Sequence, residues 1–298
     1  MAINFEYYRI FYYVAKYRNL TQAASALLSN QPNVTRVIKN MEHELGCQLF
    51  IRSNKGVSLT AEGEQLYSHV AIAFEQLQTG EEELSGSISL KSGTVSIGAS
   101  ETALHLYLLD KLRLFHENYP NVRLKVYNYN TPQAITALRK GQVDFAVVAT
   151  PAPVSAPFQS IHLKSFQNIL AGGARYQEYS KAKHALKELS SHSLICLDKN
   201  TTTREFYERF YLEHGLALEP DIEVATADLV LPMILNNLGI GFLPLDFARR
   251  AIEEKQVFQI PLNESIPERS ICMVYDTKRG FGVAARELQN MLREDSNI

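Results

Sequence analysis

Residues 21–45, TQAASALLSNQPNVTRVIKNMEHEL, contain two helical patterns separated by a short polar turn. Residues 21–28 are rich in small side chains, which allow another helix to cross close to them. Residues 29–31 are typical of a turn, and Pro32 follows in the first helical turn, where proline is tolerated. From there to residue 44, apolar residues recur at helical spacing. The stretch therefore predicts a helix-turn-helix whose second helix has one apolar and one polar side.

The flanking residues complete a small module. Residues 5–18 place aromatic and apolar side chains at helical spacing, so we expect a first helix that ends near Arg18. Thr21 is suited to cap the second helix. Gly46 ends the third helix, and residues 49–52 and 57–59 predict a small β-wing with Arg52 and Lys55 near its tip. The N-terminus is thus predicted to be an all-α winged helix-turn-helix.

Charge is distributed unevenly along the 298 residues. The first 60 residues hold seven Lys or Arg and three acidic residues, a net charge of +4. Because the whole chain carries −2, the remaining residues carry −6. A basic module joined to an acidic one is expected when only one end contacts phosphate.

Five short motifs follow one another in the first 63 residues: Ala23-Ala24, Ser29-x-Gln31-Pro32-x-Val34-Thr35-Arg36-x-Ile38, Glu42-x-Glu44-Leu45-Gly46, Leu49-Phe50-x-Arg52 and Leu59-Thr60-x-x-Gly63. In order and spacing they resemble the LysR-type transcriptional regulators. The chain differs from the commonest pattern at Asn33, where a small residue is usual, at Thr35, where Ser is usual, and at Met41, where Leu is usual. These differences concern the preferred target sequence more than the fold.

The resemblance implies that the third helix and the wing contact double-stranded DNA. Arg36 can donate two hydrogen bonds to guanine, Gln31 and Asn33 can pair with adenine, and the methyl group of Thr35 can contact thymine. The alternative is a merely solvated helix face, and for Lys39 it explains the residue equally well. The candidate DNA-binding residues are Thr21, Gln22, Gln31, Pro32, Asn33, Thr35, Arg36, Lys39, Asn40, Arg52 and Lys55.

A long helix is predicted from residue 60 to about residue 84, because this segment has no proline and spaces its apolar residues by four and three. The seam consists of Leu66, Val70, Ala73, Leu77, Gly80 and Leu84. The resemblance implies a linker helix that pairs with its copy in a homodimer, and hence a partly palindromic DNA site. The family commonly forms tetramers, whereas the seam supports a dimer. The alternative is a helix that packs on its own chain.

These features divide the chain into three parts. We assign the winged helix-turn-helix to residues 1–60 and the linker helix with a hinge to residues 61–92. The small and polar Ser85-Gly86-Ser87 marks that hinge. The remaining residues, 93–298, form the predicted effector-binding domain.

Beyond residue 93, predicted strands and helices alternate as in α/β proteins. Strands are expected near residues 94–99, 122–127, 144–149, 166–172, 194–197, 222–225, 240–243 and 270–275, and helices near 104–116, 132–140, 203–214, 229–237 and 283–293. Two α/β lobes follow. The resemblance implies the fold of type 2 periplasmic binding proteins. In that fold the effector lies between the lobes, and the chain crosses twice from one lobe to the other.

We place the crossings near residues 161–165 and 266–269. The first lobe then comprises residues 93–162 and 268–298, and the second comprises residues 163–267.

The candidate effector-binding residues follow predicted strands or precede predicted helices, where free N–H groups point toward ligands. They are Ser100, Glu101, Thr102, Thr131, Thr201, Thr202, Thr203 and Thr226. Each hydroxyl is also a good helix cap, and capping alone explains any one of them. Glu101 would oppose an anion, although it also complements the dipole of its helix. We therefore expect a small polar effector that need not be anionic.

Other classes of protein fit less well. The sequence has no nucleophile elbow, P-loop or metalloprotease motif, and Gly239-Ile240-Gly241 lacks the third glycine of a dinucleotide turn. We therefore expect no enzyme, no catalytic residue, no metal and no cofactor. A transport-type binding protein would need an export signal and would not need the basic module. A redox sensor acting through Cys196 is a further alternative, although the surrounding Leu194–Leu197 stretch predicts a buried strand.

The cellular location is predicted from what the sequence lacks. No apolar run of about 18 residues occurs, and charged and polar residues interrupt the N-terminus. The three cysteines, Cys47, Cys196 and Cys272, have no C-x-x-C spacing, which fits a reducing compartment. We expect a cytoplasmic protein without membrane contact.

Overall fold

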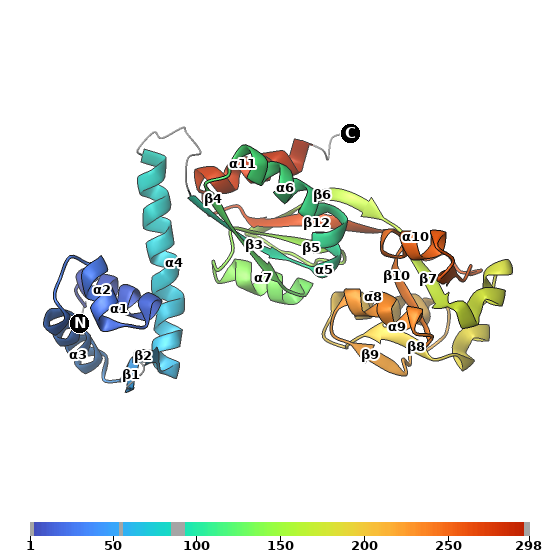
Figure 1. Ribbon diagram of the computed structural model, residues 1–298, viewed down its shortest axis with the longest axis horizontal. Coiled ribbons are helices and arrows are strands. Elements are labelled where there is room, and N and C mark those ends of the chain that lie inside the picture. The colour runs from blue at the N-terminus through green and yellow to red at the C-terminus, as the bar shows by residue number, and fades with distance from the viewer. Residues whose placement is uncertain (1–2, 54–55, 85–92, 295–298) are drawn as a thin grey trace. The chain divides into compact units, whose positions relative to one another are not determined.

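The computed structural model describes residues 3–53, 56–84 and 93–294. The chain forms two compact units, residues 1–87 and 88–298 (Figure 1). Lys55 of the predicted wing tip, the side chain of Arg52 and the predicted hinge at Ser85-Gly86-Ser87 lie outside the described part.

The N-terminal unit is built on three helices, α1 (Phe5–Tyr17), α2 (Leu20–Ala26) and α3 (Gln31–Leu45). Their apolar faces meet in one core, with Phe11, Val14, Val34, Ile38 and Met41 buried. Ala23 and Ala24 of α2 are also buried in this core, which agrees with the expected close helix crossing. The helix-turn-helix is formed as the sequence predicts.

The cap of α2 differs from the prediction. Asn19, and not Thr21, precedes the helix with an extended backbone. Its side chain accepts hydrogen bonds from the backbone N–H groups of Thr21 and Gln22 at 2.9 and 3.1 Å. Because Asn19 already satisfies these donors, the helix begins at Leu20 and the prediction of Thr21 as the cap is wrong.

Two strands and a long helix complete the unit: β1 (Phe50–Ser53), β2 (Gly56–Leu59) and α4 (Ala61–Leu84). Glu42 Oε1 accepts hydrogen bonds from the backbone N–H groups of Leu49 and Phe50 at 2.8 and 3.1 Å, which ties α3 to the start of β1. Thr60 Oγ1 donates to the carbonyl of Gln48 at 2.7 Å and accepts from Gly63 N at 3.0 Å. These motif residues thus hold the helix-turn-helix, the wing and α4 together.

Aromatic rings pack α4 against α1. Phe74 stacks on Phe5 and Tyr12, with ring centroids 5.9 and 4.8 Å apart. Stacked aromatic pairs add about 0.5–1.5 kcal/mol beyond the area they bury. These contacts make the described part of α4 an element of the N-terminal unit.

Part of the predicted seam on α4 is buried in the N-terminal unit, and part of it is exposed. Val70 is buried in the core of the N-terminal unit, and Leu66 packs against the same core. These two residues therefore pack on their own chain, which was the alternative to dimer pairing. Ala73 is exposed, and the side chain of Leu77 is 48 % exposed. Among the seam residues whose burial is described, Ala73 and Leu77 are thus the exposed ones that a second helix can contact.

The first lobe of the C-terminal unit is a five-stranded sheet in the order β4-β3-β5-β12-β6. Its strands are β3 (Gly93–Ala99), β4 (Val122–Asn128), β5 (Phe145–Ala149), β6 (Phe158–Phe166) and β12 (Arg269–Asp276). Helix α7 (Thr131–Arg139) covers one face, and α6 (Leu109–Asn118) and α11 (Val283–Glu294) cover the other (Figure 1). A short helix, α5 (Glu101–Ala103), and a π-helical turn, Leu104–Leu108, lead into α6.

The second lobe is also a five-stranded sheet, in the order β11-β7-β10-β8-β9. Its strands are β7 (Asn168–Gly173), β8 (Leu194–Leu197), β9 (Ile222–Val224), β10 (Ile240–Pro244) and β11 (Val257–Gln259). Helix α8 (Thr202–Glu213) packs on one face, and α9 (Val230–Leu235) and α10 (Leu245–Glu253) pack on the other. Short 3-10 helices at Ala174–Lys181, Leu186–Ser191 and Ala227–Leu229 lie between these elements.

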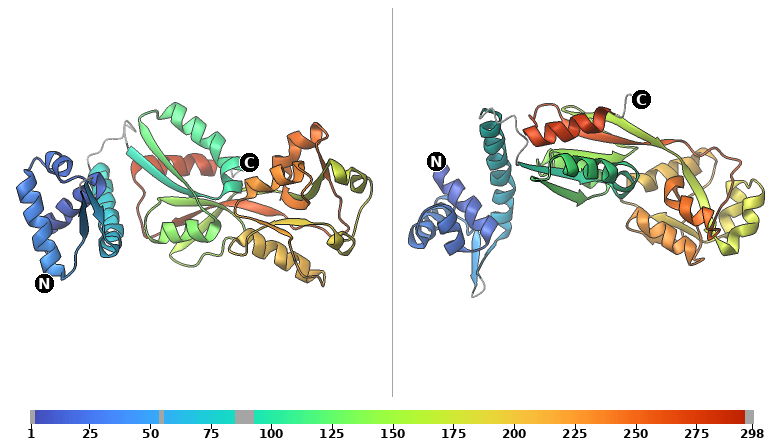
Figure 2. Two further views of the ribbon diagram at one scale, coloured as in Figure 1. Left: turned by 60° about the horizontal axis from the view of Figure 1, so that its bottom comes forward. Right: turned by 45° about the horizontal axis from the view of Figure 1, so that its top comes forward.

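The chain passes between the lobes beside β6 and β12, which pair antiparallel (Figures 1 and 2). Ser165 still pairs with Ser270 and Phe166 pairs with Arg269, so β6 stays in the first sheet to its last residue. The first crossing therefore lies at Gln167, a little later than the expected 161–165. The second ends where β12 begins at Arg269, inside the expected range.

Candidate functional sites

The predicted DNA-contacting residues of α3 lie opposite its buried face. Five of them are exposed, and Asn33 and Thr35 are half-buried. The exposed residues are Gln31, Pro32, Arg36, Lys39 and Asn40. Thr21 and Gln22, in the first turn of α2, are exposed as well. The structure thus leaves one polar face of α3 open for contact, as a DNA-contacting helix requires.

Arg36 is held by a short hydrogen-bond chain. Its Nη2 donates to Asn33 Oδ1 at 3.0 Å, and Asn33 Nδ2 donates to Ser29 Oγ at 3.1 Å. The guanidinium has five N–H donors, so donors remain for a base or a phosphate. Asn33, one of the departures from the family pattern, therefore orients Arg36 before any DNA is bound.

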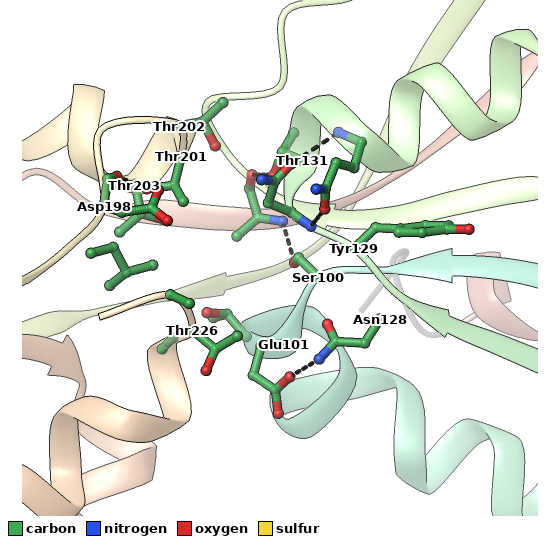
Figure 3. Close-up of a pocket in the computed structure, with 17 residues that line it drawn as sticks. Ser100, Glu101, Asn128, Tyr129, Thr131, Asp198, Thr201, Thr202, Thr203 and Thr226 are labelled. Carbon is green, nitrogen blue, oxygen red and sulfur yellow. Dashed lines mark hydrogen bonds between the residues drawn. The ribbon is translucent and has the colours of Figure 1, made fainter. Parts of the chain in front are cut away.

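A cavity of about 270 Å³ lies between the two lobes of the C-terminal unit (Figure 3). It is bounded by the carboxyl ends of β3, β4 and β5 in the first lobe and of β8 and β9 in the second. All eight predicted effector-binding residues line it: Ser100, Glu101, Thr102, Thr131, Thr201, Thr202, Thr203 and Thr226. Residues from both halves of the unit thus meet around one space.

The lining hydroxyls differ in what they can still bind. Thr201 caps α8 by accepting from Arg204 N at 3.1 Å, and it donates to the carbonyl of Asp198 at 3.0 Å. Its hydroxyl proton is therefore already used. Ser100 Oγ instead accepts from Ala149 N and Ala103 N at 3.1 and 3.4 Å, so its proton is left to donate.

Five further polar residues line the cavity beside the eight candidates: Asn128, Tyr129, Asn130, Gln133 and Asp198. Asp198 directly follows β8, and Asn128 is the last residue of β4. Both stand at the carboxyl end of a parallel strand. Ligands bind beyond the carboxyl ends of such strands. Searching those positions for amides and carboxylates, and not chiefly for hydroxyls, would have identified Asp198 and Asn128.

Glu101 is oriented by two neighbours. His105 Nε2 lies 2.7 Å from Glu101 Oε1, and Asn128 Nδ2 donates to Glu101 Oε2. The Glu101 side chain is only 14 % exposed. With Asp198 it gives the cavity two carboxylates, whereas no Lys, Arg or His occurs among the described residues that line it.

Arg269 lies behind the cavity wall, where the lobes join, and is 3 % exposed. Its Nε donates to the carbonyl of Thr150 in the first lobe at 2.6 Å, and its Nη2 donates to Thr203 Oγ1 in the second at 2.9 Å. Phe166 and Phe206 face the guanidinium at 5.5 and 5.1 Å. Burial lowers the pKa of Arg269, but an arginine keeps its proton in proteins. Within the described chain this cation has no carboxylate partner.

Cys196 of β8 is buried, as its apolar surroundings predict. Burial raises the pKa of this thiol to about 11, although the nearby positive charge of Arg204 opposes the shift. The Arg204 donors bind Glu208 at 2.9 Å and Glu223 at 2.8 Å, so its charge is largely compensated. Since the thiolate is the reactive form, these surroundings argue against a redox sensor at Cys196.

A thiol-reactive disulfide reagent should therefore modify only Cys47 quickly in the native protein at pH 8. Cys47 is half-buried, whereas Cys196 and Cys272 are buried and have pKa values raised by burial. With a pKa of about 11, Cys196 stays almost fully protonated up to pH 9, so raising the pH from 7 to 9 should leave its labelling slow. Mass spectrometry of labelled peptides measures this, with urea-denatured protein as the fully reactive control. Fast labelling of native Cys196 would contradict the buried thiol.

No group of three or more His, Cys, Asp or Glu side chains among the described residues is placed to hold a metal ion. No helix in the described ranges is long and apolar enough to cross a membrane.

Comparisons with known proteins agree with this architecture. Residues 5–64 match the bacterial regulatory helix-turn-helix protein, lysR family, and residues 89–297 match the LysR substrate binding domain. The HTH-type transcriptional regulator YofA of Bacillus velezensis is 25 % identical over 285 residues, which cover 96 % of each chain. The RuBisCO operon transcriptional regulator of Allochromatium vinosum is 20 % identical over 269 residues, which cover 90 % of this chain and 88 % of that protein.

Solved structures show the same fold. A full-length cysteine-to-aspartate variant of OxyR from Pseudomonas aeruginosa has a TM-score of 0.71 at 19 % identity, covering 100 % of this chain and 96 % of that one. Full-length CbnR complexed with its target DNA has a TM-score of 0.69 at 16 % identity, covering 98 % and 99 %. The matched family consists of transcription regulators and not of enzymes. This chain therefore belongs to the LysR family, as a transcription regulator with a DNA-binding helix-turn-helix and an effector-binding domain.

Proposed function

We propose that a small polar effector binds in the cavity between the lobes and thereby changes how the protein engages its DNA site. The observation that carries this proposal is that all eight predicted effector residues, from both lobes, line one cavity. An effector that contacts both lobes has a different affinity for different lobe arrangements. Only such a difference can shift the protein between states that bind DNA differently.

On the DNA side, α3 enters the major groove and recognises bases through Gln31, Asn33, Thr35 and Arg36. The exposure of α3 and the hydrogen bond from Arg36 to Asn33 support this assignment. The remaining contacts, mostly with phosphates, come from Thr21, Gln22, Pro32, Lys39, Asn40, Arg52 and Lys55. The protein thus requires both base and backbone contacts.

In this proposal α4 pairs with its copy in a homodimer through a surface that includes the exposed side chains of Ala73 and Leu77. Two copies of α3 then contact one face of the DNA, about one helical turn apart or a multiple of it. Two such dimers form the tetramer that the family resemblance implies.

A tryptophan placed in the cavity tests the link between effector and DNA. Ala225 lines the cavity and is exposed, so Ala225→Trp should fill the space without disturbing the core. Ala182 is also exposed but lies away from the cavity lining, so Ala182→Trp is the matched control. DNA affinity is measured by fluorescence anisotropy with and without each member of a library of small polar metabolites.

The expected result is a metabolite that changes the DNA affinity of the wild type and of Ala182→Trp about 5- to 150-fold, the usual range of allosteric coupling. The Ala225→Trp protein should bind DNA without responding to it. An equal response in all three proteins would move the effector site away from this cavity.

A further inference from the structure

Each lobe places a negative charge on the cavity wall. Glu101 of the first lobe and Asp198 of the second supply carboxylates to its lining, and no basic side chain of the described residues lines it. A purely anionic effector would therefore meet two like charges without a cation in direct contact, which is unfavourable in a partly buried site.

The positive charge of Arg269 is buried behind the cavity wall. Arg269 has no carboxylate partner in the described chain, and its guanidinium reaches the cavity only through Thr203 Oγ1. Because Thr203 accepts this hydrogen bond, its own proton is free to donate to an acceptor in the cavity. A buried cation without a counterion favours an anionic group nearby. A purely cationic effector would leave that preference unmet.

Two sets of lining residues differ in the ligand group that they can bind: the hydroxyls of Ser100 and Thr203 can donate to a ligand oxygen, and the Glu101 carboxylate can accept from a ligand N–H group. Ser100 Oγ accepts two backbone N–H groups, so its proton, like that of Thr203, is available to a ligand oxygen. The Glu101 oxygens each accept one hydrogen bond, from His105 and Asn128, and a carboxylate has room for about four. Figure 3 shows Glu101 and Asn128 together on one side of Ser100, and Thr201, Thr203 and Asp198 together on another. The Asp198 carboxylate already accepts a hydrogen bond from Asn200 N at 3.0 Å.

We propose that the effector is a small amino acid whose carboxylate accepts hydrogen bonds from Ser100 and Thr203 and whose ammonium group donates to Glu101. This inference rests on the proposed function, because it names the ligand class of the same cavity. Arg269 is a positioning residue here: it holds the hydroxyl of Thr203 and adds positive charge behind it. The cavity of about 270 Å³ fits a molecule of this size, just below the usual range for larger ligands.

Titration calorimetry with the twenty common L-amino acids and the full-length protein tests the inference. The tightest ligand is then compared with its des-amino acid and its decarboxylated amine, each of which lacks one charge. Both analogues should bind about tenfold more weakly or worse, since each loses one ionic hydrogen bond. Glu101→Gln should weaken the amino acid about tenfold, while the des-amino acid should bind at least as tightly as it binds the wild type, because a like charge is removed.

Thr203→Val should show the complementary pattern, with weaker binding of the amino acid and of the des-amino acid but unchanged binding of the amine. Glu205→Gln is the matched control, because Glu205 is exposed on α8 and does not line the cavity. If the des-amino acid binds as tightly as the amino acid, or if Glu101→Gln has no effect, the inference is overturned.

The outcomes also separate this inference from the proposed function. A protein that binds its DNA site but none of the amino acids overturns the ligand class and leaves the proposed function intact. If an amino acid binds Ala225→Trp as tightly as the wild type, the cavity is not its site, and the cavity-based function fails together with the inference.

Discussion

Gly63→Ala should lower the free energy of unfolding of the N-terminal unit by about 3 kcal/mol, the upper part of the usual range for overpacking. A Cβ atom at Gly63 would lie 2.1 Å from the backbone oxygen of Leu49 and 3.1 Å from its carbonyl carbon. Backbone atoms cannot rotate away as a flexible side chain can, so α4 or β1 must shift. Hydrogen exchange of the α1–α3 amides in the full-length protein measures the loss.

Gly46→Ala is the control for this experiment. Gly46 ends α3 with φ +70, and a Cβ there would have no atom within 4 Å. The substitution therefore tests backbone strain without a clash, and about 1–2 kcal/mol is expected. If Gly63→Ala costs no more than Gly46→Ala, the close approach of α4 to Leu49 is wrong.

Arg36→Ala should reduce the preference for the cognate DNA site over random DNA about tenfold to a hundredfold. A bidentate contact to a base contributes about 1–3 kcal/mol of discrimination, and the Asn33 bridge places the guanidinium on the open face of α3. Affinity for random DNA should fall much less, because only one positive charge is lost. Anisotropy titrations of both DNAs at one salt concentration give the ratio.

Arg9→Ala is the matched control for Arg36. Arg9 lies on α1, also in the N-terminal unit, and pairs with Glu6 at 3.1 Å. Its loss removes the same charge but no predicted base contact, so the preference for the cognate site should stay unchanged. A similar loss of preference in both variants would show that Arg36 contributes charge alone.

The helix-turn-helix could be predicted from residues 21–45 because its signals are local. Helical spacing, a proline in a first turn and a glycine after a last turn each involve neighbouring residues. The cap was placed wrongly because two polar residues, Asn19 and Thr21, compete there, and only the backbone conformation decides between them. The roles of Glu42 and Gly63 were not predictable, since both depend on the contact with Leu49 from another segment.

The cavity could be predicted in part for a similar reason. Hydroxyl residues that follow strands or precede helices were found from spacing, and the fold brings all eight together. Arg269 gave no such signal, because its partners Thr150 and Thr203 are far from it in sequence. Strand β6, helix α10 and strand β11 were also absent from the predicted elements. The predicted lobe crossing at residues 161–165 falls inside β6, and the sequences of α10 and β11 were not recognised as separate patterns.

Selection of genomic fragments by the purified full-length protein at near-physiological salt shows whether the protein recognises a specific DNA sequence. We expect enrichment of a short, partly palindromic site, since paired copies of α3 contact two half-sites. Fragments bound without any shared sequence would contradict it, because the open face of α3 would then contact phosphates only and the protein would not select its promoters.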